Sequence, residues 1–480
     1  MATGNWDEKN KPTIPGWYNR FKNKAQERIG TGIHGVLAMP VKANWGPVNT
    51  VTAITVTSTS ENTLKKTFGE DPDYTAYRLG KLALLGQPKA VLFYRLVDGS
   101  QKTATLTLKN NASTPADAIK LETKYPTTRK FNVTIRSNIA DSSKVDFILY
   151  EGATQLFSMS AISGAIDEII AAINSNIENE YLVATKVSGA TGTIGNVANQ
   201  ALTGGNDGTA GITSEHYLDA MSAFEGYGMD GFALDGISDQ SLQASVKAWV
   251  IKNKEEGTNI IAFVGGPESN YSLEQANSRS KEFNHEDIVN VFATTATYEG
   301  NTYTSSEVAV YIAALATAAG LKDSICNAVT IFDDIQPRLN KTDTAAALAA
   351  GTLVLAKDAD DVIVVDDVNT FKNYTDDKTE VFGSIRAIKF MNAVDGDTSL
   401  KRKDFNGKTT NDDTGRALII IALKQYFETL VAAGVIKDDF TVEIDTELQA
   451  TAKSDELFWK WDATYLDVIK RVYGTGNVTK

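Results

Sequence analysis

Hydrophobic and polar positions follow two different patterns along this chain of 480 residues. In residues 29–100, and again in 207–371, short apolar runs such as IHGVLAMPV and AVLFYRL alternate with longer stretches that have helical spacing. Apolar runs bounded by turn residues predict buried strands, and the stretches between them predict helices. This β–α–β order predicts one discontinuous α/β domain, with a parallel or mixed sheet covered by helices.

Residues 101–206 have a different pattern, dominated by short strands rich in threonine and valine, such as FNVTIRS and VDFILYE. One helix is expected at about residues 161–177, and a long glycine-rich run follows at 188–211. We interpret residues 101–206 as a β-rich domain inserted into the α/β domain, with the glycine-rich run as a flexible return linker. Such an insertion is expected on the outer surface, where excision leaves the α/β core closed.

Residues 372–470 predict a small α+β domain around a helix that starts near Arg416. The run 417–423 is apolar on every side of that helix, which predicts burial nearly all round. The segments FTVEI and LFWKW predict strands of the same domain. The predicted fold class is therefore α/β with a β-rich inserted domain, a small α+β C-terminal domain and extended N- and C-terminal arms.

The two ends of the chain, residues 1–28 and 471–480, are polar segments with apolar anchors. We expect these arms to add strands to sheets of neighbouring copies, with FTVEI as a receiving strand whose edge is otherwise exposed. For the N-terminal segment, packing on its own domain is an equal alternative. The predicted arm and receiving-strand residues are Ile14, Trp17, Tyr18, Phe21, Val442, Ile444, Val472, Tyr473 and Val478.

Composition narrows the range of partners. The formal net charge of −13 argues against nucleic acid as a direct partner, because phosphate binding requires a basic face. A single cysteine, Cys326, allows no disulfide within the chain and no cysteine-based metal site. The N-terminus has no apolar region typical of a signal peptide, and no apolar run reaches the length of a membrane span. We therefore expect a soluble protein, assembled in a cytoplasm and not inserted in a membrane.

Partial motifs for phosphate binding lack essential residues. Gly407-Lys408-Thr409 resembles the end of a phosphate-binding loop, but Arg402 stands where its first glycine is required. Glycines at 189, 192 and 195 lie in the glycine-rich run rather than between a strand and a helix.

Partial motifs for metal chemistry are equally incomplete. His285-Glu286 begins an HExxH pattern in which Val289 replaces the second histidine. Asp360-Asp361 and Asp366-Asp367 adjoin a strand and are candidate metal ligands, with solvated strand ends as the alternative. We predict no cofactor, no metal and no catalytic site.

Several segments together form a recognisable combination. The opening GNWDEKNKPTIPGWYNRF has a tryptophan, an Asn-Lys pair, a Pro-Gly pair and aromatic residues. The turn Trp45-Gly46-Pro47, the long helix from Arg416 and the closing DATYLDVIKRVYGTGNVTK belong to the same combination. At both ends these motifs resemble the tail sheath proteins of contractile phage tails and R-type bacteriocins, and the middle of the chain resembles that family by architecture.

The resemblance implies a structural subunit that polymerises as a helical sleeve around an inner tube and contracts to drive the tube through a cell envelope. It implies further copies of the chain, the inner tube protein, and baseplate and tail terminator proteins as partners. The implied location is a virion or bacteriocin tail assembled in the bacterial host. The C-terminal domain would face the tube.

Two other classes of function compete with this interpretation. An α/β enzyme acting on a phosphate or sugar substrate requires a pocket at strand ends near Asp235, Gly265-Gly266 or Asp366. An adhesin or surface-layer protein would explain the threonine-rich strands, but it requires an export signal.

Overall fold

The computed structural model describes the chain except for residues 1, 6–15, 20–33, 268–270 and 480. It divides into two compact units. The larger unit comprises residues 33–396 and 467–480, and the smaller comprises 1–32 and 397–466. The division at residue 396 lies within one helix, later in the chain than the boundary expected at residue 372.

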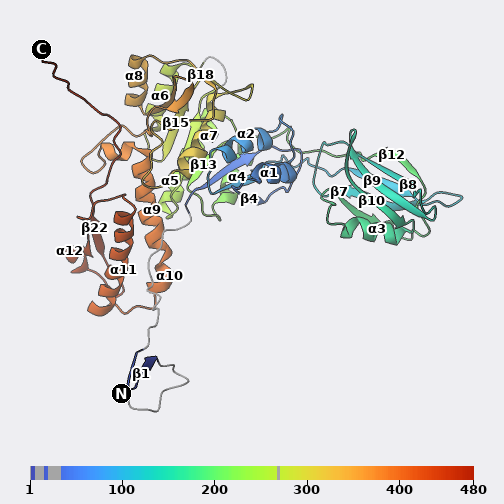
Figure 1. The fold of residues 1–480 in the computed structure, drawn as a ribbon, viewed down its shortest axis with the longest axis horizontal. Helices are drawn as coiled ribbons and strands as arrows, with labels where there is room; N and C mark the ends of the chain where they lie inside the picture. Colours follow the sequence, from blue (N-terminus) through green and yellow to red (C-terminus); the bar gives the residue numbers. More distant parts are fainter. Residues whose placement is uncertain (1, 6–15, 20–33, 268–270, 480) are drawn as a thin grey trace. The chain divides into compact units, whose positions relative to one another are not determined.

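The larger unit is organised around an eight-stranded sheet (Figure 1). Its inner strands are parallel, and the edge strands β20 and β4 run antiparallel to their neighbours. In spatial order the strands are β20 (Asp361–Val364), β19 (Thr352–Asp358), β15 (Ile288–Phe292), β14 (Ile261–Gly265), β13 (Gly231–Ala233), β3 (Val36–Val41), β5 (Ala90–Arg95) and β4 (Val51–Thr55).

Helices cover both faces of this sheet because its central strands are apolar on both sides. Along β3, Leu37 and Met39 belong to one core cluster, whereas Val36 and Ala38 belong to the cluster on the opposite face. The helices are α1 (Ser60–Phe68), α2 (Thr75–Leu85), α4 (Ser214–Phe224), α5 (Gln240–Glu255), α6 (Leu273–Phe283), α7 (Ser305–Ala318) and α8 (Lys341–Ala350). A small sheet, β17 (Asn301–Tyr303), β16 (Thr295–Tyr298) and β18 (Asp334–Gln336), adjoins them.

The β-rich region forms two sheets and one helix (Figure 1). One sheet has the order β10 (Thr154–Ser163), β9 (Lys144–Glu151), β8 (Phe131–Ser137) and β12 (Val197–Ala201). The other has β11 (Leu182–Lys186), β7 (Asp117–Thr123) and β6 (Thr105–Lys109), and the helix is α3 (Ile166–Ser175). Apolar side chains from both sheets and α3 share one core.

Two expectations for this region are wrong. The helix begins at Ile166 rather than near residue 161, because β10 continues to Ser163. The glycine-rich run is not a free linker: it contains β12, and Ile194, Thr203 and Asn206 form bridges to residues near β6. Backbone pairing requires no apolar side chain, which is why composition alone suggested flexibility.

The inserted region is joined to the α/β body by a buried aromatic and guanidinium cluster. Trp45, from the turn after β3, is 1% exposed and belongs to the core of the two-sheet region. The centroid of the Trp45 ring lies 5.2 Å from that of Tyr125. The guanidinium carbon of Arg129 lies over the Trp45 ring, 5.1 Å from its centroid. Buried Arg95 donates to the carbonyls of Gly46, Pro126 and Asp207. Excision of residues 101–206 would therefore expose Trp45 and remove one acceptor of Arg95, and a closed α/β core after excision stays a prediction.

We predict that Trp45→Ala loosens this joint and destabilises the larger unit. Removing a buried tryptophan typically costs about 3–5 kcal/mol through lost burial and the cavity that remains. Urea unfolding followed by far-ultraviolet circular dichroism measures the change. Tyr227→Ala, at a 44% exposed position, is the matched control and should change stability by less than about 0.5 kcal/mol. Equal effects of the two substitutions would show that Trp45 does not secure the joint.

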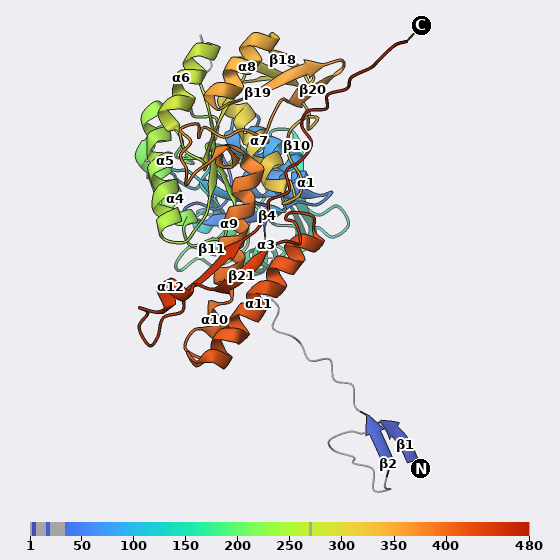
Figure 2. The same ribbon diagram turned by 90° about the vertical axis from the view of Figure 1, so that its left-hand side faces the viewer.

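The smaller unit centres on one long helix and a two-stranded sheet (Figure 2). Its elements are the end of α9 (Ile385–Leu400), α10 (Arg402–Phe405), α11 (Asp413–Ala432), β21 (Thr441–Ile444), α12 (Thr446–Gln449) and β22 (Trp459–Asp462). The Asp412 side chain caps α11 by accepting from the backbone amide of Gly415. Buried Tyr426 donates to Asp397, which ties α11 to the end of α9. No helix in the described part of the chain is long and apolar enough to cross a membrane.

Candidate functional site

The C-terminal segment after Lys470 has no regular secondary structure and is exposed throughout residues 471–479 (Figure 1). The predicted arm residues Val472, Tyr473 and Val478 are 86%, 88% and 99% exposed. Folding of the single chain does not explain why three large apolar side chains stay so exposed, which suggests that another surface covers them.

The N-terminal segment contains two short strands that pair with each other in parallel, β1 (Ala2–Asn5) and β2 (Gly16–Asn19). The predicted arm residues Trp17 and Tyr18 lie in β2. Ile14 and Phe21 lie outside the described residues. A two-stranded sheet by itself is at best marginally stable in water, so pairing of a further strand with β2 would stabilise it.

The predicted receiving strand forms β21, which pairs antiparallel with β22. Val442 lies opposite Trp461 and is buried, whereas Ile444 is half-buried opposite Trp459. The centroid of the Phe427 ring of α11 lies 5.1 Å from that of Trp461, so α11 packs against this sheet. In the described part of the chain β21 pairs only with β22, so the other edge of β21 is a candidate site for an added strand.

The predicted residues thus form two sets rather than one cluster. Val442 and Ile444 belong to the smaller unit, whereas Val472, Tyr473 and Val478 belong to the larger.

The apolar run that starts α11 is not buried all round, which corrects the expectation from its sequence. Leu423 and Ile420 are buried, but Leu418 and Ile421 are 52% and 53% exposed, and Ala417 is exposed beside them. We name Ala417, Leu418 and Ile421 the α11 stripe. One side of the helix packs on the aromatic residues of its unit. The α11 stripe is the part of the apolar helix surface that this core does not cover. The apolar run indicates more apolar surface than a small unit can cover, but it does not indicate which of its residues stay exposed.

The strand ends that an enzyme would use are filled by protein groups. Asp235 accepts hydrogen bonds from Tyr217 (2.7 Å) and Thr75 (2.8 Å), and burial raises its pKa to about 6. A side chain at Gly266 would meet the Tyr271 ring at 2.0 Å. Asp366 is paired with Lys470. Among the described residues, protein groups therefore lie against all three of these places.

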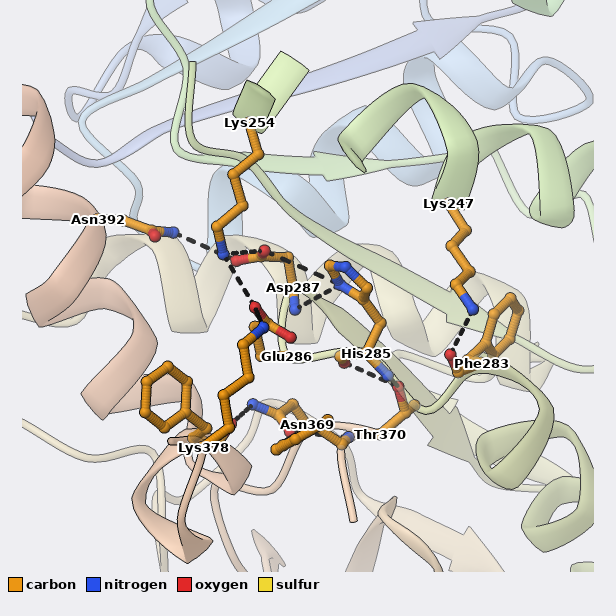
Figure 3. Close-up of polar contacts among 12 residues, drawn as sticks. Lys247, Lys254, Phe283, His285, Glu286, Asp287, Asn369, Thr370, Lys378 and Asn392 are labelled. Atoms are coloured by element: carbon orange, nitrogen blue, oxygen red, sulfur yellow. Dashed lines mark hydrogen bonds and ion pairs between the residues drawn. The ribbon is translucent and has the colours of Figure 1, made fainter. Parts of the chain in front are cut away.

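The HExxH remnant lies in an ion-pair network (Figure 3). His285, Glu286 and Asp287 place potential ligand atoms within 4.8 Å of one another. Lys254 Nζ lies 2.6 Å from Asp287 and 3.3 Å from Glu286, and Lys378 Nζ lies 2.6 Å from Glu286. The two ammonium groups occupy the positions a cation would take.

The surroundings shift the pKa of Glu286 and of His285. Burial raises the pKa of Glu286, but the hydrogen bond from Lys378 and the nearby Lys254 outweigh it and lower the pKa to about 2. Burial lowers the pKa of His285, whose Nδ1 accepts from the amide of Asp287 (Figure 3). The ion pairs of Lys254 and Lys378 form a structural network, which joins α5 to the start of β15.

We predict that Lys254→Met destabilises the larger unit by about 3 kcal/mol, because it leaves buried Asp287 without its ammonium partner. Urea unfolding at neutral pH measures the loss. Lys252→Met on the same helix is the matched control, since Lys252 is 55% exposed and pairs only at the surface. That control should cost less than about 1 kcal/mol. If Lys254→Met also costs so little, the network is not structural.

Three family models match the chain. They describe the phage tail sheath protein beta-sandwich domain at residues 97–207, the central domain at 210–370 and the C-terminal domain at 377–479. The Phage-like element PBSX protein XkdK of Bacillus subtilis (strain 168) is 24% identical over 470 residues, which span 90% of this chain and 91% of that protein.

Solved structures share the fold. The sheath tail protein from Desulfitobacterium hafniense superposes with a TM-score of 0.69 at 21% identity, over 94% of this chain and 100% of its own. The helical sheath of the anti-feeding prophage in its contracted state gives a TM-score of 0.54 at 9% identity, over 97% and 99%. The predicted fold class is confirmed by these likenesses and by the separate β-sandwich and C-terminal domains.

Proposed function

This chain belongs to the phage tail sheath protein family, as its sequence resemblance predicted, and we propose that it polymerises as a helical sleeve around an inner tube and contracts to drive that tube through a target cell envelope. The matches to all three sheath domains along the chain carry this proposal. The family is a structural one, and the strand ends filled by protein groups agree with a subunit that performs mechanical rather than chemical work.

The main partner is a further copy of the chain. An open helical assembly requires a contact between two different surfaces of the subunit, so that each copy binds the next without closing. The fold shared with the helical sheath of the anti-feeding prophage supports such an assembly. Within a phage or injection-system tail, the other partners are the inner tube protein, the baseplate and the tail terminator, with no nucleic acid bound directly.

We assign the contact between copies to the arms and to the sheet of β21 and β22. The tail residues Val472, Tyr473 and Val478 are exposed, and among the described residues β21 pairs with β22 on one side only. Strand addition joins such partners through backbone hydrogen bonds, which tolerate rotation of the subunits better than a rigid side-chain interface does. The N-terminal arm, with Trp17 and Tyr18, supplies the second added strand.

We assign the surface that contacts the tube to the α11 stripe of the smaller unit. Ala417, Leu418 and Ile421 are exposed on one side of a helix whose other side forms the core of the unit. An apolar stripe of this size suits a contact that must form on assembly and also release during contraction, because its burial contributes only modest free energy per side chain.

Electron microscopy of the purified protein tests the proposal. Negatively stained preparations should contain tubes or sleeves, and the same structures should occur in lysates of the source. Compact monodisperse particles at high protein concentration would contradict it and would favour the α/β enzyme alternative.

A further inference from the structure

The root of the C-terminal tail is attached to its own subunit by a buried ion pair. Lys470 Nζ lies 2.7 Å from Asp366 Oδ1 and also contacts Asp367 Oδ1. The side chains of Lys470, Asp366 and Asp367 are 16%, 11% and 1% exposed. In so dry a place an ammonium between two carboxylates is far stronger than a surface ion pair.

The two carboxylates belong to a rigid part of the larger unit. They follow β20, and the Asp367 amide donates to Asp366 Oδ1. Ser384 Oγ donates to Asp367 Oδ2 (3.1 Å), and the carbonyl of Asp367 accepts from the amide of Ile385 at the start of α9 (2.9 Å). The acceptors are therefore positioned without the tail, and Lys470 is the partner that arrives from it.

The chain changes character immediately after this contact. Lys470 is half-buried and paired, whereas residues 471–479 are all exposed and have no secondary structure. Beyond Lys470, Arg471 reaches Asp366 only at 3.9 Å, with its side chain 67% exposed. The uninterrupted exposed run of the tail therefore begins directly after the paired Lys470.

We propose that Lys470, Asp366 and Asp367 form a latch that sets the exit point and the reach of the C-terminal arm, and so regulates how it engages a second copy of this chain. The inference rests on the proposed function, in which the arm joins neighbouring subunits. With the latch closed, residues 471–480 reach at most about 35 Å, and opening it frees residues 468–480, up to the ion pair of Asp467 with Arg386, which reach about 45 Å. A closed latch also orders the arm root before assembly, which lowers the entropy lost when the next copy binds.

A spin label beside the latch tests its existence. We place a nitroxide at residue 469 by Ile469→Cys in a Cys326→Ser background, because Ile469 is 85% exposed and adjoins Lys470. The full-length protein is kept dilute enough to be monomeric in sedimentation. We expect a broadened spectrum with Lys470 present and a narrow, mobile spectrum in Lys470→Gln. Lys453→Gln, at a side chain 80% exposed, is the matched control and should leave the spectrum unchanged.

The same variants test the regulatory role. Lys470→Gln should raise the protein concentration needed for sleeves about tenfold, because more of the arm must then be ordered on assembly. Replacing both acceptors, by Asp366→Asn together with Asp367→Asn, should reproduce that effect, and adding Lys470→Gln to this variant should change nothing further, as expected for two ends of one contact. Should Lys470→Gln fail to fold, Lys470→Gln with Asp367→Asn removes the unpaired buried charge and carries the same test.

An unchanged spectrum at residue 469 in Lys470→Gln, or an unchanged assembly threshold, would overturn the latch. Neither result concerns whether the arm joins subunits, which is tested separately by removing residues 471–480. The failure of the latch and the failure of the proposed function are therefore distinguishable.

Discussion

Replacing Leu423 by Asp should unfold the C-terminal unit, residues 397–466, and abolish sleeve formation with it. Leu423 lies on the inward side of α11 and is 5% exposed, in the same turn as buried Tyr426 and Phe427. An ionised carboxylate placed there has no cation to pair with and costs several kcal/mol. A unit of this size has little stability in reserve, so the cost exceeds it.

Circular dichroism and sedimentation measure the two expected losses, of helix content and of assembly. The matched control is Leu418→Asp, five residues earlier on the same helix, where the side chain is 52% exposed. That variant should keep its helix content and form sleeves, but it should bind the tube more weakly, because it places a charge in the α11 stripe. Normal sleeves from Leu423→Asp would show that this core is not needed for assembly.

The alternation of apolar strands and amphipathic helices was sufficient to predict the α/β body. Strands such as β3 and β14 are apolar on both faces, and helices such as α6 and α7 begin at the capping residues Ser272 and Thr304. The pattern failed for a strand held by backbone pairing alone and for a helix of mixed composition. β12 lies in a glycine-rich run, and α9 contains Gly396 and several charged residues, so neither was predicted.

The candidate surfaces were predicted only as far as composition reveals them. The exposure of Val472 and Tyr473 could be predicted because they lie in a short terminal segment with too few apolar residues to form a core. The exposure of Leu418 could not be inferred from periodicity, because a helix apolar on every side has no marked outer face. The Lys470 latch joins residues more than a hundred positions apart, and which of many lysines meets which aspartates depends on tertiary structure.

Removing either arm should leave a folded monomer that cannot polymerise. Deleting residues 1–22 removes β1 and β2, and ending the chain at Lys470 removes the exposed tail but keeps the latch. Because residues 471–479 are exposed, their loss should not change the circular dichroism spectrum. Each backbone hydrogen bond of an added strand contributes about 1 kcal/mol net, so losing about four of them weakens the contact about a thousandfold.

Sedimentation and electron microscopy measure that loss, and a point substitution separates strand addition from side-chain contact. Thr475→Pro keeps the tail length but removes a backbone donor, and it should impair assembly nearly as much as the truncation when that donor faces the receiving strand. Thr475→Ala is the matched control and should assemble normally. The substitutions Val472→Thr and Val478→Thr should have smaller effects than Thr475→Pro, since they leave the backbone donors in place. Sleeves of full length from either truncated chain would show that the missing arm is not the connector, and the contact between copies would then have to lie on other surfaces, with the α11 stripe as the next to test.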